Sequence, residues 1–308
     1  MTAAKAERLA PDAPPRSPRV TIGLPVYNGA RTVESTIRPL LAQTYTDFEI
    51  LVSDNASTDE TQQIVERLAR EDARIRYVRQ PVNIGANGNY SFVAREARGE
   101  FLKWSSSSDW VAPTFLAECV AVLDARPDAV IAAPRTRLWT GTPSNFQESR
   151  DDVAILGETP CERLIDMFIR LHKNNAFNGL IRLSALRRTR LVETYLSADM
   201  VLMGHLAALG KFVLLDSPLY YRRNEVSTST VMQPLAERLR HHYPTNSARM
   251  LFQRWRLRLG WCRVALRAPM PVDQRVRAVA FMGRQLWEAR DELRDDVLTA
   301  LRYVFRRG

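Results

Sequence analysis

Short apolar runs and amphipathic segments alternate along the first half of the chain. The apolar runs are typical of buried strands and occupy residues 19–25, 48–53, 76–78, 100–104 and 129–133. The segments between them carry apolar residues at helical spacing and lie at 32–43, 57–70, 89–98 and 113–125. This alternation predicts an α/β, Rossmann-like fold, in which a mostly parallel sheet has helices on both faces.

The alternation breaks after residue 133. Residues 134–158 are polar and irregular, which predicts a loop. Further on, the pattern predicts helices at 161–171 and 199–209 and short strands at 178–182 and 212–215. From residue 234 onward it predicts only helices, over 234–243, 246–268 and 272–306. We therefore expect one α/β domain over 18–230, with halves at 18–133 and 134–230, and a helical extension over 231–308.

Charge and composition change this picture mainly at the two ends. Residues 1–17 are rich in Ala, Pro and Arg and lack an apolar core, so we expect a disordered leader and no signal peptide. Residues 231–308 hold sixteen Arg, no Lys and seven Asp or Glu, which is +9 of the formal +10 of the chain. Such a basic segment suits anionic lipid, phosphates or nucleic acid, or is simply a solvated helical face.

Cysteine use and hydropathy bear on the compartment. The three cysteines are far apart and odd in number, so they predict neither a disulfide framework nor a zinc site. No window approaches 18 uninterrupted apolar residues, so no transmembrane helix is expected. These features favour a cytoplasmic protein.

Polar and aromatic residues follow the predicted strands directly. Ligands of parallel α/β sheets bind beyond the carboxyl ends of the strands. Asp54, in a turn rich in Ser, Thr and Asn, can accept a hydrogen bond from the N–H edge of uracil, thymine or guanine. Alternatively, Asp54 and Ser57 only cap the next helix, for which Thr58 is a candidate N-cap. Tyr27 offers a flat face for a base, and Asn87 can reach a ribose or phosphate or simply form a turn.

These segments also resemble a known family. Residues 18–225, most clearly 19–109, are similar to inverting family-2 glycosyltransferases of GT-A fold, through TIGLPVYNG at 21–29, QTYTDFEILVSDNASTD at 43–59, NIG at 83–85 and ARGEFL at 97–102. The resemblance implies a nucleotide diphosphate sugar as donor, with Asp54 at the nucleobase. The donor-binding residues that we expect are Pro25, Val26, Tyr27, Asn28, Asp54, Asn83, Gly85, Asn87, Ser107, Ser108 and Asp109.

The chain departs from the family pattern at the diphosphate. The family usually has an Asp-x-Asp or Asp-Asp motif for Mn²⁺ or Mg²⁺ after the fourth strand, where this chain reads WSSSSDW at 104–110 and keeps only Asp109. Asp109 therefore either still holds a divalent metal, or a cation replaces the metal, or the site is inactive. The candidate replacing cations are Arg222, Arg223 and Lys173.

The resemblance places the catalytic base in the acceptor half. Inversion needs a carboxylate on the side opposite the leaving group, and Asp199 falls at the base position of the family. As an alternative, Asp199 only stabilises a helix N-terminus. His205 is a second candidate base or a structural histidine.

The partners follow from the same resemblance. We expect the sugar to pass to a hydroxyl of a glycan, a lipid-linked acceptor or a small molecule. Arg-rich helices with interleaved Trp and Leu over 252–267 suggest peripheral contact with the inner face of the membrane, or packing on the catalytic domain or a homodimer partner. No motif supports nucleic-acid binding. The competing function is a catalytically impaired nucleotide-sugar-binding or scaffold protein.

Overall fold

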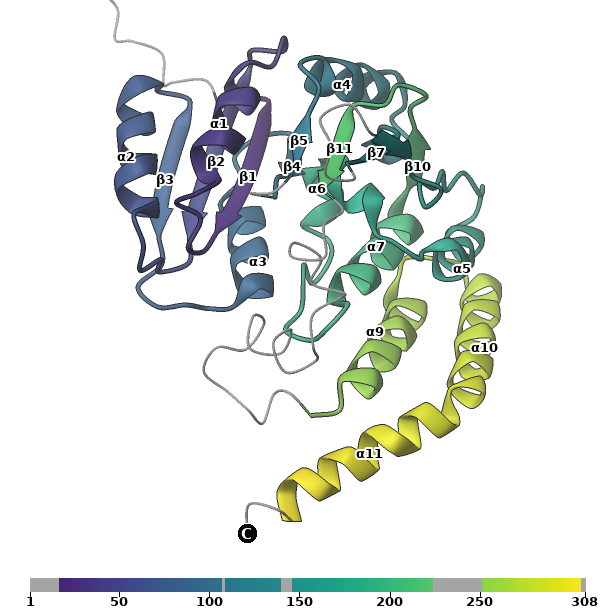
Figure 1. Ribbon diagram of the computed structural model, residues 1–308. Coiled ribbons are helices and arrows are strands. Elements are labelled where there is room, and N and C mark those ends of the chain that lie inside the picture. Colours follow the sequence, from purple (N-terminus) through teal and green to yellow (C-terminus); the bar gives the residue numbers. More distant parts are fainter. Residues whose placement is uncertain (1–16, 107–108, 140–145, 224–250, 306–308) are drawn as a thin grey trace, which may run out of the picture.

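The computed structural model describes residues 17–106, 109–139, 146–223 and 251–305 of the chain (Figure 1). Its central sheet has seven strands in the order β10-β6-β9-β4-β1-β2-β3. These strands are β1 (Val20–Val26), β2 (Phe48–Asp54), β3 (Ile75–Arg79), β4 (Phe101–Trp104), β6 (Ala129–Ala133), β9 (Leu180–Arg182) and β10 (Lys211–Leu214). Strand β9 is antiparallel to both neighbours, and the other adjacent pairs are parallel. The predicted α/β fold with a mostly parallel sheet is confirmed.

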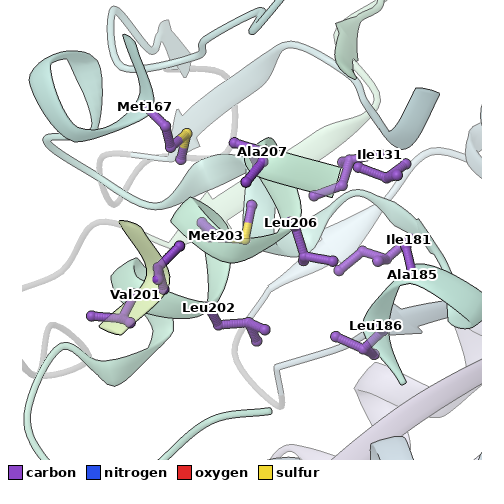
Figure 2. Close-up of a cluster of buried hydrophobic side chains, with 14 of the residues drawn as sticks. Ile131, Met167, Ile181, Ala185, Leu186, Val201, Leu202, Met203, Leu206 and Ala207 are labelled. Atoms are coloured by element: carbon purple, nitrogen blue, oxygen red, sulfur yellow. The ribbon is translucent and has the colours of Figure 1, made fainter. Parts of the chain in front are cut away.

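Helices cover both faces of this sheet because its strands are apolar on both sides. Ile50 packs into a core cluster with α1 (Val33–Leu41), α2 (Thr61–Glu71) and α4 (Phe115–Ala125), and its neighbour Leu51 packs into the opposite one. The second cluster holds α3 (Ala86–Glu96), α5 (Pro160–Arg170), α6 (Leu183–Leu186) and α7 (Ala198–Leu209). In Figure 2, Leu206 of α7 extends toward Ile181 of the sheet. Helix α7 is thus buried against the sheet.

A second, smaller sheet corrects the predicted loop at 134–158. Its order is β5-β11-β7-β8, with β5 (Trp110–Val111), β7 (Thr136–Trp139), β8 (Phe146–Glu148) and β11 (Tyr220–Arg223). Trp110 stacks on Tyr221 with ring centroids 5.6 Å apart, and the edges of Trp139 and Phe146 meet Trp110. Because these aromatic contacts come from distant segments, the polar local sequence gave no sign of the strands.

Several predicted helix bounds were also wrong. Helix α2 begins at Thr61, so Thr58 is not its N-cap, and α3 begins at Ala86, so Asn87 is helical. The segment predicted as one helix over 272–306 is two helices, α10 (Val272–Glu288) and α11 (Arg290–Phe305), separated at Ala289. The predicted helix at 234–243 lies outside the described residues, as does the start of the one at 246–268, whose described part is α9 (Gln253–Arg267).

The C-terminal helix α9 packs on the α/β domain through one close approach. A Cβ at Gly204 of α7 would lie 2.1 Å from the Trp261 ring, so glycine is what lets the indole lie on the helix backbone. Phe168 of α5 meets the edge of Trp261 at 5.0 Å and that of Phe281 of α10 at 5.5 Å. Helices α9 and α10 therefore share a core with the sheet. Within the described part of the chain, no helix has the length and apolar character needed to cross a bilayer.

Candidate donor and acceptor site

The first two strands end side by side and place the predicted nucleotide residues together. Strands β1 and β2 are parallel, with Val26 in register with Asp54. Asn28 has a left-handed backbone conformation, with φ 50°. It links the two strand ends through two hydrogen bonds. Its side-chain Oδ1 accepts from the Thr58 backbone N–H at 2.8 Å, and its backbone N–H donates to Ser57 Oγ at 2.9 Å. Tyr27 beside it is 45% exposed, and Pro25 and Val26 form the end of the buried strand. An exposed ring thus stands at the strand end, as base stacking requires.

The Asp54 carboxylate is fully buried and well supplied with donors. Its Oδ1 accepts from the Ser57 amide at 2.8 Å, which closes the turn after β2. Its Oδ2 accepts from the Tyr77 hydroxyl at 2.7 Å and from Arg79 Nη1 at 3.2 Å. Burial and the neighbouring carboxylate raise the pKa of Tyr77, so its hydroxyl stays a donor. The exposed polar group at this point is Arg79, whose side chain is 37% exposed.

The turn after β3 is held by asparagines that bond to one another. Asn83 Oδ1 accepts from Asn55 Nδ2 and from the Gly85 amide, both at 2.9 Å. Gly85 has φ 78°, a left-handed conformation that suits glycine at the start of α3. The Asn87 amide donates to the carbonyls of Glu193 and Tyr195 at 2.8 and 3.0 Å. The Asn87 side chain therefore links the donor half to the segment that precedes α7.

Asp109 interacts with two buried residues, Tyr220 through a hydrogen bond and Lys103 through its charge. The Tyr220 hydroxyl donates to Asp109 Oδ2 at 2.6 Å. Lys103 of β4, only 1% exposed, donates from Nζ to the Trp104 carbonyl at 2.9 Å and lies 5.7 Å from the centroid of the Tyr220 ring. Burial lowers the pKa of Lys103 from 10.5 to about 8, and the Asp109 charge opposes this shift. A cation thus lies within the electrostatic reach of Asp109.

Asp199 is in the first turn of α7 and faces the same region. Asn174 Nδ2 donates to Asp199 Oδ2 at 2.7 Å. Burial raises the pKa of Asp199 above its ordinary 3.8, against the effect of the Asn174 hydrogen bond, backbone amides and the Arg222 charge. A carboxylate with a raised pKa is a stronger base than an exposed one. Asn174 Oδ1 is buried and has no hydrogen-bond partner among the described residues.

Tyr90 of α3 shows that these charged groups gather at one place. Burial raises the pKa of its hydroxyl to about 12, with further contributions from Asp109 and Asp199 and an opposing one from Arg222. Arg222 donates from Nη1 to Asn175 Oδ1 at 3.0 Å. Two carboxylates and one guanidinium from separate segments therefore act on the same buried hydroxyl.

The structure gives no contact between the other predicted site residues and Asp109 or Asp199 among the described side chains. Ser107 and Ser108 lie outside the described residues, and of Arg223 only the backbone, at the end of β11, is described. Lys173 Nζ pairs with Asp151 at 3.2 Å, away from the Tyr220–Asp109 contact. His205 of α7 lines a cavity against α9. Of the predicted replacing cations with a described side chain, Arg222 is the one beside Tyr90.

Asp109 is the described residue that the sequence predicts as a metal ligand. Within the described part of the chain, no three His, Cys, Asp or Glu side chains gather closely enough to form a metal site. The described residues therefore do not by themselves form a site for a protein-bound metal. Mg²⁺ and Mn²⁺ can also be held by one carboxylate together with substrate phosphates, and in that case Asp109 would be the protein ligand.

Sequence reasoning missed several residues of this site. Lys103 is the charged residue of the otherwise apolar strand β4, and this was the available signal for it, whereas Tyr220 begins the polar strand β11 and had no comparable signal. Asn174 and Arg79 gave no local signal, because their partners Asp199 and Asp54 are 25 residues away in sequence in each case. Such pairs become visible only in the folded chain.

Comparison with known proteins agrees with this architecture. The model of "Glycosyl transferase family 2" matches residues 21–184, which is more than half of the chain. A β-1,3-glucosyltransferase of Campylobacter jejuni, named for GalNAc(5)-diNAcBac-PP-undecaprenol, is 33% identical over 93 residues, 30% of each chain. The poly(ribitol-phosphate) β-N-acetylglucosaminyltransferase TarS of Staphylococcus aureus is 29% identical over 143 residues, 45% of this chain and 25% of TarS. Each matched stretch thus spans a third or less of the curated relative.

Solved structures show the same fold at low identity. TarS residues 1–349 in complex with UDP superpose with a TM-score of 0.62 at 16% identity, over 88% of this chain and 72% of that one. The Pyrobaculum calidifontis mannosyltransferase PcManGT in complex with GDP-Man and Mn²⁺ gives 0.55 at 18% identity, over 99% and 79%. The predicted GT-A fold is confirmed. With the family model matching most of the α/β domain, this chain belongs to glycosyl transferase family 2.

Proposed function

We propose that the protein is an inverting glycosyltransferase that moves a sugar from a nucleotide diphosphate sugar to a hydroxyl of a glycan, lipid-linked or small-molecule acceptor. The observation that carries the proposal is the position of the Asp199 carboxylate in the first turn of α7, where Asn174 holds it through a hydrogen bond of 2.7 Å. Family membership supports a nucleotide-sugar donor, and the relatives include a TarS complex with UDP-GlcNAc.

The donor base lies at the ends of β1 and β2. The exposed ring of Tyr27 stacks on the base, and the buried Asp54 carboxylate holds Arg79 at the pocket through the 3.2 Å contact. Arg79, held in place by Asp54, then presents a hydrogen-bond donor to the edge of the nucleobase. The diphosphate lies toward Asp109, where Arg222 supplies fixed positive charge to the leaving group.

Asp199 takes the proton of the acceptor hydroxyl. The hydroxyl oxygen then attacks the anomeric carbon while the bond from that carbon to the diphosphate breaks, and the nucleoside diphosphate departs with the bonding electrons. The unpartnered Asn174 Oδ1 accepts a hydrogen bond from a second group of the acceptor. Attack and departure on opposite sides invert the anomeric configuration.

A transfer and hydrolysis screen tests the proposal. Purified protein is incubated with UDP-, dTDP- and GDP-sugars and simple glycan acceptors, and the wild type is compared with Asp199→Asn. We expect one donor class to be consumed, with about 10²–10⁴-fold slower turnover in the variant and nearly equal donor affinity. If the protein binds a nucleotide sugar but the wild type never turns it over, the catalytically impaired binding protein is the correct function.

We also propose that the C-terminal helices touch a membrane surface, which would bring a lipid-linked acceptor to the site. One face of α10 exposes apolar side chains at helical spacing, with Val272 73%, Val276 63% and Trp287 70% exposed. Arginines such as Arg284 lie on the same helix, and anionic headgroups attract them.

A further inference from the structure

The cavity lined by His205 lies between α7 and α9. It has a volume of about 420 Å³, within the range of about 300–1,000 Å³ typical of small-molecule sites. Its walls come from the segment 188–193, from α7 and from α9 with the residues that follow it. His205, the second candidate base, lines it, but Asp199 and the residues proposed for donor binding do not, so the cavity is separate from the proposed transfer site.

The floor of this cavity is apolar. Ala198, Val201 and Leu202 of α7 and Val264 of α9 line it, and each is at most 6% exposed. Figure 2 labels Val201 and Leu202 on α7, at the edge of the cluster and away from the sheet residues Ile131 and Ile181. An apolar floor of this kind takes a hydrocarbon group, because the surface it covers leaves water.

The rim is strongly basic. Four arginines line the cavity, Arg188, Arg190, Arg263 and Arg267, against one carboxylate, Glu193. Glu193 is bonded by Arg190 at 2.8 Å and by Arg263 at 3.0 Å, so its charge is already shared by two of the arginines. Arg188 and Arg267 form no ion pair with any acidic residue whose side chain is described. The described rim therefore has a net positive charge. Guanidinium groups bind phosphate and carboxylate oxygens with paired hydrogen bonds.

We propose that this cavity is a binding site for an amphiphilic anion, with the phosphate or carboxylate head at Arg188 and Arg267 and the hydrocarbon part on the α7–α9 floor. The ligand comes either from a lipid headgroup in a bilayer or from a soluble alkyl phosphate or fatty acid, which share this chemistry. The site goes beyond the transfer reaction, because it uses no residue of the donor pocket.

The cavity wall also connects to the transfer site. Asn87 donates to the carbonyls of Glu193 and Tyr195, and Asp199 follows four residues after Tyr195.

Binding of decyl phosphate to the full chain tests the site. Titration calorimetry below the critical micelle concentration compares the wild type with Arg188→Gln/Arg267→Gln and with a matched control, Arg70→Gln/Arg95→Gln, whose exposed arginines lie on α2 and α3 outside the cavity. We expect at least tenfold weaker binding in the cavity variant alone. Decanol and inorganic phosphate, each carrying one half of the ligand, should bind the wild type at least tenfold more weakly than decyl phosphate.

Equal affinity of the three proteins for decyl phosphate would overturn the proposal, as would inorganic phosphate binding as tightly as decyl phosphate. Vesicles of phosphatidylglycerol and of phosphatidylcholine then identify the source. Binding to the anionic vesicles that the cavity variant loses, and the control variant keeps, supports a bilayer lipid as ligand. Binding of monomeric decyl phosphate without this vesicle dependence supports a soluble amphiphile. Thermal unfolding midpoints within about 2 °C of the wild type ensure that the arginine variants are folded.

Discussion

Asn174 Nδ2 donates a hydrogen bond of 2.7 Å to Oδ2 of Asp199, and Asn174 Oδ1 is buried with no hydrogen-bond partner in the described part of the chain. This hydrogen bond favours the ionised carboxylate, whereas burial disfavours it. Burial has the larger effect, so the pKa of Asp199 is raised. Asn174 therefore both orients the proposed base and limits the rise of its pKa.

Replacement of Asn174 should shift the pH dependence of transfer. Asp199 must be ionised to act as a base, so activity rises with pH as its proton is lost. Asn174→Leu removes a hydrogen bond that lowers the pKa of Asp199, and the acidic limb of the pH–rate profile for kcat should move to higher pH. Asn178→Leu is a control for asparagine loss in the same loop. An unchanged acidic limb with reduced kcat would mean that Asn174 does not touch the titrating group.

Lys103 should make stability depend on pH in the alkaline range. Its pKa is about 8 in the folded protein and about 10.5 when unfolded, so between these values the unfolded chain binds more protons. Stability therefore rises with pH from about 8 to about 10.5, by up to about 3 kcal/mol at 1.36 kcal/mol per pKa unit. Below pH 8 the buried charge is destabilising.

Urea unfolding of the wild type and of Lys103→Met from pH 7 to pH 10 measures this effect. The unfolding free energy of the wild type should rise relative to that of Lys103→Met as the pH increases through this range. Lys173→Met serves as a control, because that ammonium is half-exposed on the surface. Parallel curves for wild type and Lys103→Met would show that Lys103 titrates near its ordinary pKa.

How much of this site follows from the sequence depends on how local each feature is. The strand–helix alternation and the strand-end positions of Tyr27 and Asp54 are local, and the structure confirms both. The smaller sheet escaped prediction, since Trp110 and Tyr221 meet only after the chain has folded. The Asn174–Asp199 bond and the cavity between α7 and α9 likewise depend on packing between distant segments.

Substitution of Arg79, at the proposed nucleobase site, should weaken donor binding without affecting proton transfer by Asp199. Arg79→Ala removes the exposed partner of Asp54, and a charged hydrogen bond contributes about 1.5–3 kcal/mol. The Kd of the bound nucleoside diphosphate should rise about 10–100-fold, measured by calorimetry. Arg70→Ala, on the exposed surface of α2, should bind like the wild type. If both variants bound the nucleoside diphosphate with the same affinity, the nucleobase would not lie at Arg79.

Arg222 and metal removal distinguish the two ways of stabilising the diphosphate. If Arg222 acts as the fixed cation, Arg222→Ala should lower kcat about 10²–10³-fold, and the wild type should remain active in EDTA. Arg137→Ala is the matched control, since Arg137 lies on the adjacent strand β7 and pairs in register with Tyr221. Loss of activity in EDTA that Mn²⁺ or Mg²⁺ restores would instead support a metal bound through Asp109.

The exposed face of α10 should bind anionic membranes. Trp287→Ser and Val276→Ser each remove a side chain that is more than 60% exposed, so folding should be little affected while the apolar area available to the interface falls. We expect the double variant to sediment with phosphatidylglycerol vesicles several-fold less than the wild type at low salt. Leu298→Ser on α11, a side chain that is also exposed, tests whether any apolar loss has the same effect. If wild-type protein ignores the vesicles and forms dimers that the double variant loses, a second copy of the chain covers this face instead.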